Sequence, residues 1–399
     1  MRYVPHLRFP EFSGEWEEKR LAEISNKITK KNKGNVIQNV LSNSANLGII
    51  PQNDYFDRDI ANVDNTDSYY IIKQGDFVYN PRKSTTAPYG PVNIYNGEKP
   101  GIISPLYLCF SVLNILPMFL FYRFKSPVWH PYVYSHGDTG VRFDRVSIKD
   151  DVFFGMPIYT PAIDEQEKIA AFLSLLDERI ATQNKIIEKY ESLINGLNDS
   201  LYRQYRDSIT TSFSELGYSY SGLSGKSASD FGTGKPFITY LNVYSNNIVD
   251  ETDYQYVNIQ ESEKQNVVRY GDVLFTLSSE TPEEVGVGSV YLGTDQVYLN
   301  SFCFGIHIEN ENLAYPPYLS YYVSSTQFRK FIYPFAQGST RFNLCKADFE
   351  KAAITLPSLD NQKRIHSILN CITEKLNTEK SILEQYAILK QYLLSQMFI

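Results

Sequence analysis

The chain contains a long internal repeat, which constrains its fold more than any other feature of the sequence. Residues 161–197 read PAIDEQEKIAAFLSLLDERIATQNKIIEKYESLINGL, and residues 357–399 read PSLDNQKRIHSILNCITEKLNTEKSILEQYAILKQYLLSQMFI. A constant offset of 196 residues aligns Pro161 with Pro357, Gln166 with Gln362 and Tyr190 with Tyr386. Because repeats of this length set the architecture of a chain, the sequence predicts a tandem duplication in which each unit is a variable domain followed by a long helix.

Each repeated segment carries apolar residues spaced alternately by four and three. This spacing makes a narrow apolar seam, which is typical of a coiled coil rather than of an ordinary surface helix. Gln183 and Glu379 occupy the same position in the two seams, where a polar residue can fix register and partner. Because each seam needs a facing seam, we expect an antiparallel pair within the chain rather than two separately packed helices. The predicted seam residues are Ile169, Leu173, Leu176, Ile180, Ile187, Tyr190, Leu197, Ile365, Leu369, Ile372, Leu376, Leu383, Tyr386 and Leu393.

The two variable regions share a weak common frame. Gly75-Asp76 and Gly271-Asp272 keep the offset of 196 residues, and each pair precedes an alternating apolar segment typical of a strand. The predicted fold class is therefore α+β, with two mixed α/β domains joined by the two long helices. The predicted segments are a first domain at 1–160, a central long helix at 161–207, a second domain at 208–356 and a C-terminal long helix at 357–399.

The charge of the chain argues against a protein that grips nucleic acid alone. The net charge is −7, and residues 208–356 hold 9 basic and 16 acidic side chains. Proteins that bind DNA unaided are usually basic, because neutralising phosphates supplies much of their affinity. A DNA reader of this composition would therefore need partners that hold the backbone.

The location of the protein is predicted from what the sequence lacks. No apolar run approaches the roughly 20 residues of a membrane span, and the first residues have no signal-peptide core. The four cysteines, Cys109, Cys303, Cys345 and Cys371, are scattered and form no CxxC pair. We expect a cytoplasmic protein with reduced thiols that are buried and structural.

The sequence shows no constellation typical of an enzyme. The five histidines are isolated, and no phosphate-binding loop of the GxxxxGK[ST] type is present. Residues 315–318, YPPY, look like the Pro-Pro-aromatic motif of amino-methyltransferases, but Tyr315 stands where that motif needs a polar side chain. Pro316 and Pro317 are predicted to begin a helix instead. We expect no catalytic residue and no metal site.

Over essentially its whole length, the chain resembles the specificity subunit of type I restriction–modification systems. The motifs that carry the resemblance are LRFPEFSGEWEEKRLAEI, PAIDEQEKIAAFLSLLDERI, LPSLDNQKRIHSILNCITEKL and QGSTRFNLCKADF. The resemblance implies two target-recognition domains, each reading one half of a split DNA sequence, with the helices setting the spacer between the halves. It also implies two methyltransferase subunits and two translocase/nuclease restriction subunits as partners. S-adenosylmethionine, ATP and Mg²⁺ would belong to those partners, and this chain would bind no cofactor.

The candidate DNA-binding residues are polar side chains on predicted exposed loops: those after the Gly-Asp strands, the matching RF motifs, and the segments NVLSNSANLG and YLNVYSNN. Arginine commonly reads guanine, and asparagine or glutamine reads adenine. In the first domain the candidates are Asn43, Ser44, Asn80, Arg82, Lys83, Ser84, Tyr89, Thr139 and Arg142, with Lys30, Lys31 and Lys33 expected at phosphates. In the second domain they are Asn242, Tyr244, Thr276, Ser278, Ser279, Gln337, Thr340, Arg341 and Asn343.

Two other functions remain open at this level. A solitary adenine methyltransferase with its own recognition domain would need a nucleotide-binding half, which no segment supplies. A coiled-coil adaptor that binds only protein would share the helices, but it would not explain two divergent, loop-rich domains.

Overall fold

The computed structural model describes residues 3–52, 66–137, 144–204 and 207–399. The candidate residues Thr139 and Arg142 lie outside this part of the chain. The chain divides into two compact units, Met1–Asn184 with Ile382–Ile399, and Lys185–Ser381. Both long helices contribute to both units.

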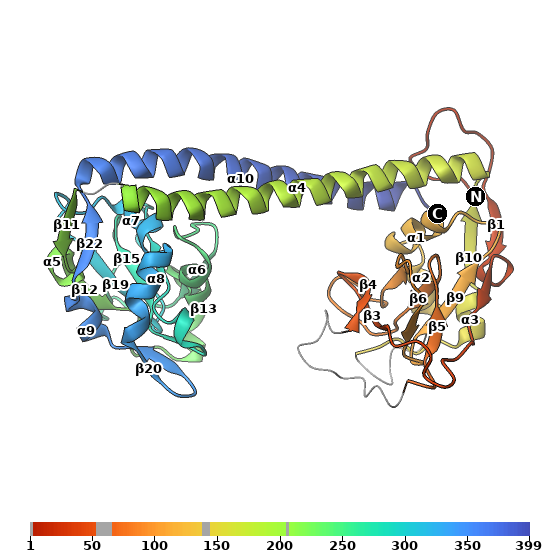
Figure 1. Ribbon diagram of the computed structural model, residues 1–399, viewed down its shortest axis with the longest axis horizontal. Helices are drawn as coiled ribbons and strands as arrows, with labels where there is room; N and C mark the ends of the chain where they lie inside the picture. The colour runs from red at the N-terminus through yellow and green to blue at the C-terminus, as the bar shows by residue number, and fades with distance from the viewer. Residues whose placement is uncertain (1–2, 53–65, 138–143, 205–206) are drawn as a thin grey trace. The chain divides into compact units, whose positions relative to one another are not determined.

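The long helices α4 (Ile163–Gln204) and α10 (Leu359–Gln396) pack together (Figure 1). In the first unit, Lys390 of α10 forms an ion pair with Asp177 of α4, and Arg179 Nε donates to the Tyr386 hydroxyl at 3.1 Å. Residue numbers rise along α4 as they fall along α10, so the helices run antiparallel. The predicted α+β class, with two packed long helices, is confirmed.

The second unit repeats this arrangement along the rest of the helices. Lys380 Nζ lies 2.8 Å from Glu191 Oε1. In both units the predicted seam side chains are buried or partly buried, and Gln183, within the seam, is only 3% exposed. The apolar seam thus faces inward along both helices, as its 4-3 spacing requires.

The described residues of the first unit form two four-stranded sheets and a two-stranded ribbon. One sheet has the order β2-β9-β6-β7, the other β4-β3-β8-β5, and β1 pairs with β10. The elements are β1 (Glu17–Arg20), η1 (Leu21–Glu23), β2 (Ser25–Lys27), β3 (Val40–Ser44), β4 (Gly48–Pro51), β5 (Tyr70–Ile72), β6 (Phe77–Tyr79), β7 (Val92–Ile94), β8 (Gly101–Ile103), β9 (Leu108–Val112), α1 (Pro117–Lys125), α2 (His130–His136), α3 (Asp150–Phe154) and β10 (Pro157–Thr160).

An aromatic core attaches this domain to the ends of both long helices. Phe77 and Phe110 stack with centroids 5.2 Å apart, and the same apolar cluster contains Leu173 of α4 and Phe398 after α10. Because helix and sheet residues share one buried cluster, the domain cannot move away from this end of the helix pair without exposing apolar surface.

The second unit repeats the central sheet of the first. Its sheet β12-β19-β15-β17 has the same order as β2-β9-β6-β7, and the parallel pair β3 and β8 reappears as β13 and β18. A three-stranded sheet, β16-β21-β20, and the ribbon β11-β22 complete the unit. The elements are β11 (Ser208–Thr211), α5 (Phe213–Leu216), β12 (Gly217–Ser221), η4 (Ala228–Asp230), β13 (Phe231–Ile238), α6 (Tyr240–Ser245), β14 (Tyr254–Val257), β15 (Val273–Thr276), β16 (Ser278–Ser279), η5 (Pro282–Glu284), β17 (Gly288–Val290), β18 (Tyr298–Leu299), β19 (Cys303–Ile308), α7 (Pro316–Tyr322), α8 (Thr326–Ile332), η6 (Tyr333–Phe335), β20 (Ala336–Gly338), β21 (Phe342–Leu344), α9 (Lys346–Lys351) and β22 (Ile354–Pro357).

Pro316 and Pro317 occupy the first positions of α7, as predicted. The expectation of buried thiols holds for Cys109 and Cys303, but Cys345 is only partly buried and Cys371 is exposed on α10. All four are free thiols. Within the described ranges there is no group of side chains that could hold a metal ion, and no helix there is long and apolar enough to cross a membrane.

Candidate nucleic-acid interface

In the first unit, the loop after β6 is built by hydrogen bonds around Asn80. Its Oδ1 accepts from the Arg82 backbone N–H at 3.0 Å, and its Nδ2 donates to the Asn43 carbonyl at 3.2 Å. Gly90, at φ +84°, closes the loop, and a Cβ there would lie 2.1 Å from the Asn80 carbonyl oxygen. This close approach admits only glycine. The side chains of Arg82 and Ser84 are left exposed.

A second cation, which we did not predict from the sequence, joins this loop. Arg82 pairs with Arg145 in an isolated antiparallel bridge, and the Lys83 N–H donates to the Asp144 carbonyl at 2.9 Å. Arg145 forms a 3.6 Å ion pair with Asp144, while its Nε is buried without a partner. The RFDR segment carries two arginines. Arg142, which the sequence predicted, lies outside the described residues, and strand pairing places Arg145 opposite Arg82.

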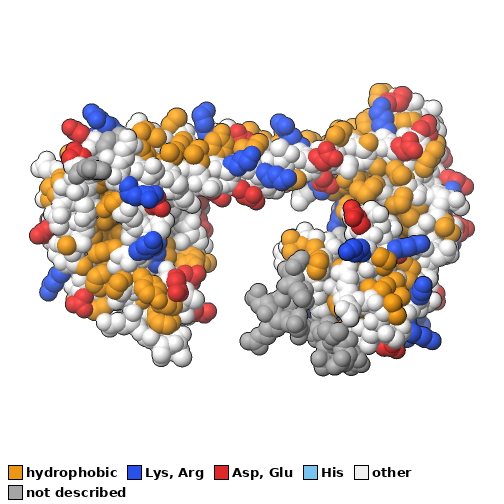
Figure 2. Space-filling view, viewed as in Figure 1, with side chains coloured by type: hydrophobic (Ala, Val, Ile, Leu, Met, Phe, Trp, Pro, Cys, Tyr) orange, Lys and Arg blue, Asp and Glu red, His pale blue; other side chains and the backbone are white. Residues whose placement is uncertain are grey.

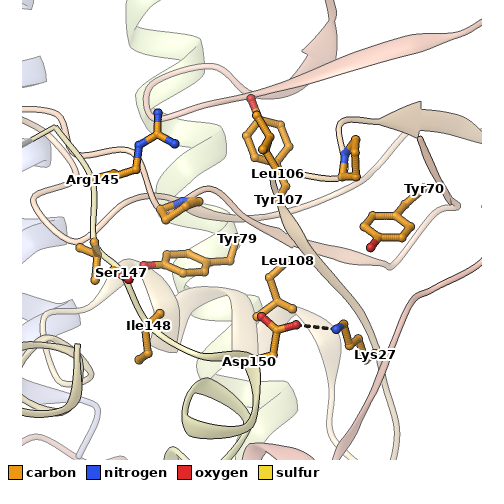
Figure 3. Close-up of a pocket in the computed structure, with 13 residues that line it drawn as sticks. Lys27, Tyr70, Tyr79, Leu106, Tyr107, Leu108, Arg145, Ser147, Ile148 and Asp150 are labelled. Carbon is orange, nitrogen blue, oxygen red and sulfur yellow. Dashed lines mark hydrogen bonds and ion pairs between the residues drawn. The ribbon is translucent and has the colours of Figure 1, made fainter. Parts of the chain in front are cut away.

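Arg145 also lines a cavity of about 400 Å³ in the first unit. Tyr70, Leu106 and Arg145 stand around this space, and an ion pair between Lys27 and Asp150 closes one side (Figure 3). The cavity places an aromatic ring, an apolar side chain and a cation next to the loop after β6.

Two of the predicted residues of the first domain face inward instead. Asn43 is 4% exposed, and its Nδ2 donates to the Val78 carbonyl at 2.8 Å while its Oδ1 accepts from Asn93 at 2.6 Å. The Ser44 hydroxyl accepts from backbone N–H groups in the turn between β3 and β4. Buried polar groups are normally paired within the protein. Both predictions are therefore corrected: Asn43 supports the sheet beneath the loop after β6, and Ser44 holds the turn between β3 and β4.

The remaining candidates of the first unit lie at its surface or partly below it. Lys30, Lys31 and Lys33 are exposed on the segment between β2 and β3, as phosphate contacts would require. Tyr89 is partly buried and lies against His130, with ring centroids 4.8 Å apart. Burial lowers the pKa of His130, which favours the neutral ring at this contact.

In the second unit, the three-stranded sheet β16-β21-β20 presents a row of polar side chains. Asn343 lies opposite Gln337 on one neighbouring strand and opposite Ser278 on the other. Directly opposed residues project from the same face of a sheet. Asn343 and Gln337 are exposed, so two amides of the class that reads adenine stand side by side.

Arg341 lies beside this row at the turn between β20 and β21. Its Nη2 is 3.2 Å from the Ser278 hydroxyl, which accepts the hydrogen bond. The side chain is otherwise exposed. The turn itself depends on Gly338, at φ +144°, because a Cβ there would lie 2.1 Å from the Arg341 carbonyl oxygen. Arg341, Thr340, Asn343 and Gln337 thus form the exposed part of the candidate surface.

Two other predicted residues of the second domain face inward. Thr276 is fully buried, and its hydroxyl accepts from the Val287 N–H at 3.0 Å. Asn242, 1% exposed, donates to the carbonyls of Asp250 and Asp253. We remove these two from the interface, because their polar atoms are already paired away from solvent.

Glu284 organises the loop that follows β16. Its carboxylate accepts from the Tyr244 hydroxyl at 2.8 Å and from the Ser279 hydroxyl at 3.1 Å. Hydrogen bonds from Tyr244, Ser279 and Thr281 lower the pKa of Glu284. Tyr244 and Ser279 are therefore committed to this carboxylate in the free chain.

The electrostatics of the two surfaces differ. The loop after β16 carries Glu280, Glu283 and Glu284, whereas the matching loop after β6 carries Arg82 and Lys83. Along the long helices, Lys and Arg side chains are interspersed with Asp and Glu (Figure 2). No basic stripe of the kind that holds a DNA backbone runs along the helices on this face.

Comparison with known proteins identifies the family to which this chain belongs. Residues 13–192 and 223–385 match the family described as the type I restriction modification DNA specificity domain. The chain belongs to this family. It is the DNA specificity subunit of a type I restriction–modification system, the non-catalytic subunit that directs the system to its sequence.

Solved structures share the fold of this specificity subunit at low sequence identity. A chain from a study of complex assembly and conformational transition of the type I restriction–modification system has 16% identity and a TM-score of 0.59, with 98% of each chain covered. The S subunit of a type I system from M. genitalium has 15% identity and a TM-score of 0.50, with 99% of each chain covered. Both likenesses cover at least 98% of this chain, which includes both domains and the long helices.

Proposed function

We propose that the specificity subunit reads a split DNA target, with one half-site for each domain and a spacer set by α4 and α10. This proposal rests on one observation: the two domains repeat the same sheet order but carry different polar residues at the aligned positions. In the first domain Arg82 and Arg145 form an isolated antiparallel bridge in the loop after β6. At the aligned place in the second domain, Ser278 of β16 pairs with Asn343 of β21. Two domains with one frame and different reading residues fit two different half-sites.

Partner subunits supply what this chain lacks. With a net charge of −7, the chain alone would displace few counterions from DNA and would bind it weakly. Methyltransferase subunits are therefore proposed to hold the DNA backbone. The restriction subunits are proposed to act on the same assembly in the cytoplasm. S-adenosylmethionine, ATP and Mg²⁺ would be bound by those partners. The complex of the type I system named above is consistent with such an assembly.

The test is methylation-sensitive sequencing of a genome in cells that express this chain with the methyltransferase subunit encoded beside it. The expected result is one split motif with two unlike halves and a fixed spacer. The purified chain alone should bind a duplex carrying that motif only weakly at physiological salt, and the methyltransferase subunit should restore specific binding. A continuous motif, or nanomolar binding by the chain alone, would contradict the proposal.

The role of the helices has a separate test. Four residues inserted at Gly196 lengthen α4 by roughly 6 Å, or close to two base-pair steps. The spacer in the methylated motif should change while both half-sites persist. A changed half-site with an unchanged spacer would contradict the ruler role.

A further inference from the structure

Two exposed apolar residues stand at the same place in both domains, beside the candidate DNA-reading residues. Leu106 is 73% exposed and Phe302 is 57% exposed, and they are separated by the repeat offset of 196 residues. A single exposed leucine or phenylalanine needs no explanation. Two large apolar side chains at one repeated position, in domains whose surface loops have otherwise diverged, do need one.

The turns that carry them are built by the same hydrogen bonds. The Leu106 N–H donates to the Ser104 hydroxyl at 3.3 Å, and the Tyr107 N–H donates to the Ser104 carbonyl at 3.1 Å. In the second domain, the Phe302 N–H donates to Asn300 Oδ1 at 2.9 Å, and the Cys303 N–H to the Asn300 carbonyl at 3.0 Å. Serine and asparagine both cap a turn in this way. The backbone therefore presents the third residue of the turn identically in both domains.

Each turn is joined to the candidate interface of its own domain. In the second domain, Leu277 donates its N–H to the Phe302 carbonyl at 2.9 Å and accepts from the Leu344 N–H of β21 at 2.8 Å. Leu277 thus links Phe302 to the sheet that carries Arg341. In the first domain, Leu106 lines the same cavity as Pro81 and Arg145 (Figure 3).

We propose that Leu106 and Phe302 are specificity-determining residues that contact the C5 methyl group of a thymine in the major groove, one in each half-site. The inference rests on the proposed function. The thymine methyl is the apolar group of the major groove, and apolar side chains are its usual partners. Polar atoms of the same half-site are assigned to Arg145, which lines one cavity with Leu106, and to Arg341, which donates to the residue after Leu277.

The test uses the complete complex with its methyltransferase subunits and duplexes in which each thymine of the target is replaced in turn by deoxyuridine. Deoxyuridine pairs as thymine does but lacks the methyl group. Removing one buried methyl group should weaken binding of the wild-type complex roughly fourfold at one position in each half-site. Phe302→Ser should abolish that sensitivity in one half-site, and Leu106→Ser should abolish it in the other.

Matched controls lie at the opposite ends of the same sheets, because β15 runs antiparallel to β19 and its beginning lies at the far end of β19 from Phe302. Tyr270, 58% exposed, precedes β15, and Leu113, 47% exposed, follows β9. Tyr270→Ser and Leu113→Ser should keep the wild-type response to deoxyuridine. No sensitive position in the wild type, or sensitivity that survives both Phe302→Ser and Leu106→Ser, would overturn the inference. Failure of the proposed function looks different, because the wild-type complex would then bind its target no better than a scrambled duplex.

Discussion

Gln166 and Gln362, 196 residues apart, make two matching buried hydrogen bonds at the beginnings of the two long helices, and Gln362 makes a third. Gln166 Oε1 accepts from the Leu116 N–H at 2.9 Å, and its Nε2 donates to the Pro161 carbonyl at 2.9 Å. Gln362 Oε1 accepts from the Tyr315 N–H at 2.8 Å, and its Nε2 donates to the carbonyls of Leu313 and Pro357. Each glutamine thereby ties the start of a long helix to the start of a short helix in the adjacent domain.

Replacing Gln362 by leucine should therefore destabilise the second unit. The side chain is fully buried, and its loss would leave one N–H and two carbonyls without partners, at a cost of about 2–4 kcal/mol. Chemical denaturation of the complete chain measures this loss. The exposed neighbour Lys363 provides the control, since Lys363→Leu should change stability by less than about 0.5 kcal/mol. Equal effects of the two substitutions would show that the glutamine bonds contribute nothing.

Two glycines should respond to alanine in opposite directions. Gly196 lies inside α4, and a Cβ there would meet nothing within 4 Å, so Gly196→Ala should stabilise the chain by about 0.5–1 kcal/mol. Gly90→Ala should destabilise it, because of the positive φ and the contact with the Asn80 carbonyl. Thermal unfolding of both variants tests the pair. Stabilisation by Gly90→Ala would contradict the geometry of the loop after β6.

Lys125 should make a pH-dependent contribution to the stability of the first unit. Burial, and then the charge of Lys390, lower the pKa of Lys125 to about 8, and its Nζ donates to Asn93 Oδ1 at 2.6 Å. In the unfolded chain the pKa is about 10.4. Between these values the unfolded state binds more protons, so this contribution to stability rises with pH.

The measurement compares the free energy of unfolding of wild type and Lys125→Met at pH 7.5 and pH 9.5. The difference should shift in favour of wild type at the higher pH, because methionine has no proton to lose. Groups that do not interact with Lys125 titrate alike in both proteins and cancel in the difference. A constant difference across this range would mean that Lys125 keeps its ordinary pKa.

Arg341 should set one base of one half-site. Arg341→Ala removes the exposed guanidinium beside Asn343, and the complex should lose about 1–3 kcal/mol of discrimination at a single base pair. Lys351, on α9, provides a control for the loss of a positive charge, because Lys351→Ala should leave the methylated motif unchanged. A relaxed base in both half-sites after Arg341→Ala would contradict its assignment to one domain.

The sequence predicted the fold class because the repeat and the 4-3 apolar spacing are local properties of the chain. Gln183, for example, could be placed in the buried seam from spacing alone. The prolines of YPPY could be placed at a helix start because the missing N–H of proline costs nothing there.

The interface was harder to predict, because strand pairing decides which polar side chains face solvent. Asn43 and Thr276 have the side chains of base readers, but the structure uses them to pair buried backbone groups. Arg145 faces Arg82 through a register that sequence alignment does not reveal. Most buried polar groups have hydrogen-bond partners, and the partners of Asn43 are distant in sequence.

The most direct test of the modular reading of DNA is an exchange of residues 208–356 for the equivalent domain of a relative that has a different methylation motif. The exchanged chain is expressed with the methyltransferase subunit, and methylated sites are sequenced across the genome. One half-site should become that of the relative, while the other half-site and the spacer stay as in wild type. A motif in which both half-sites change together would contradict the assignment of one half-site to each domain.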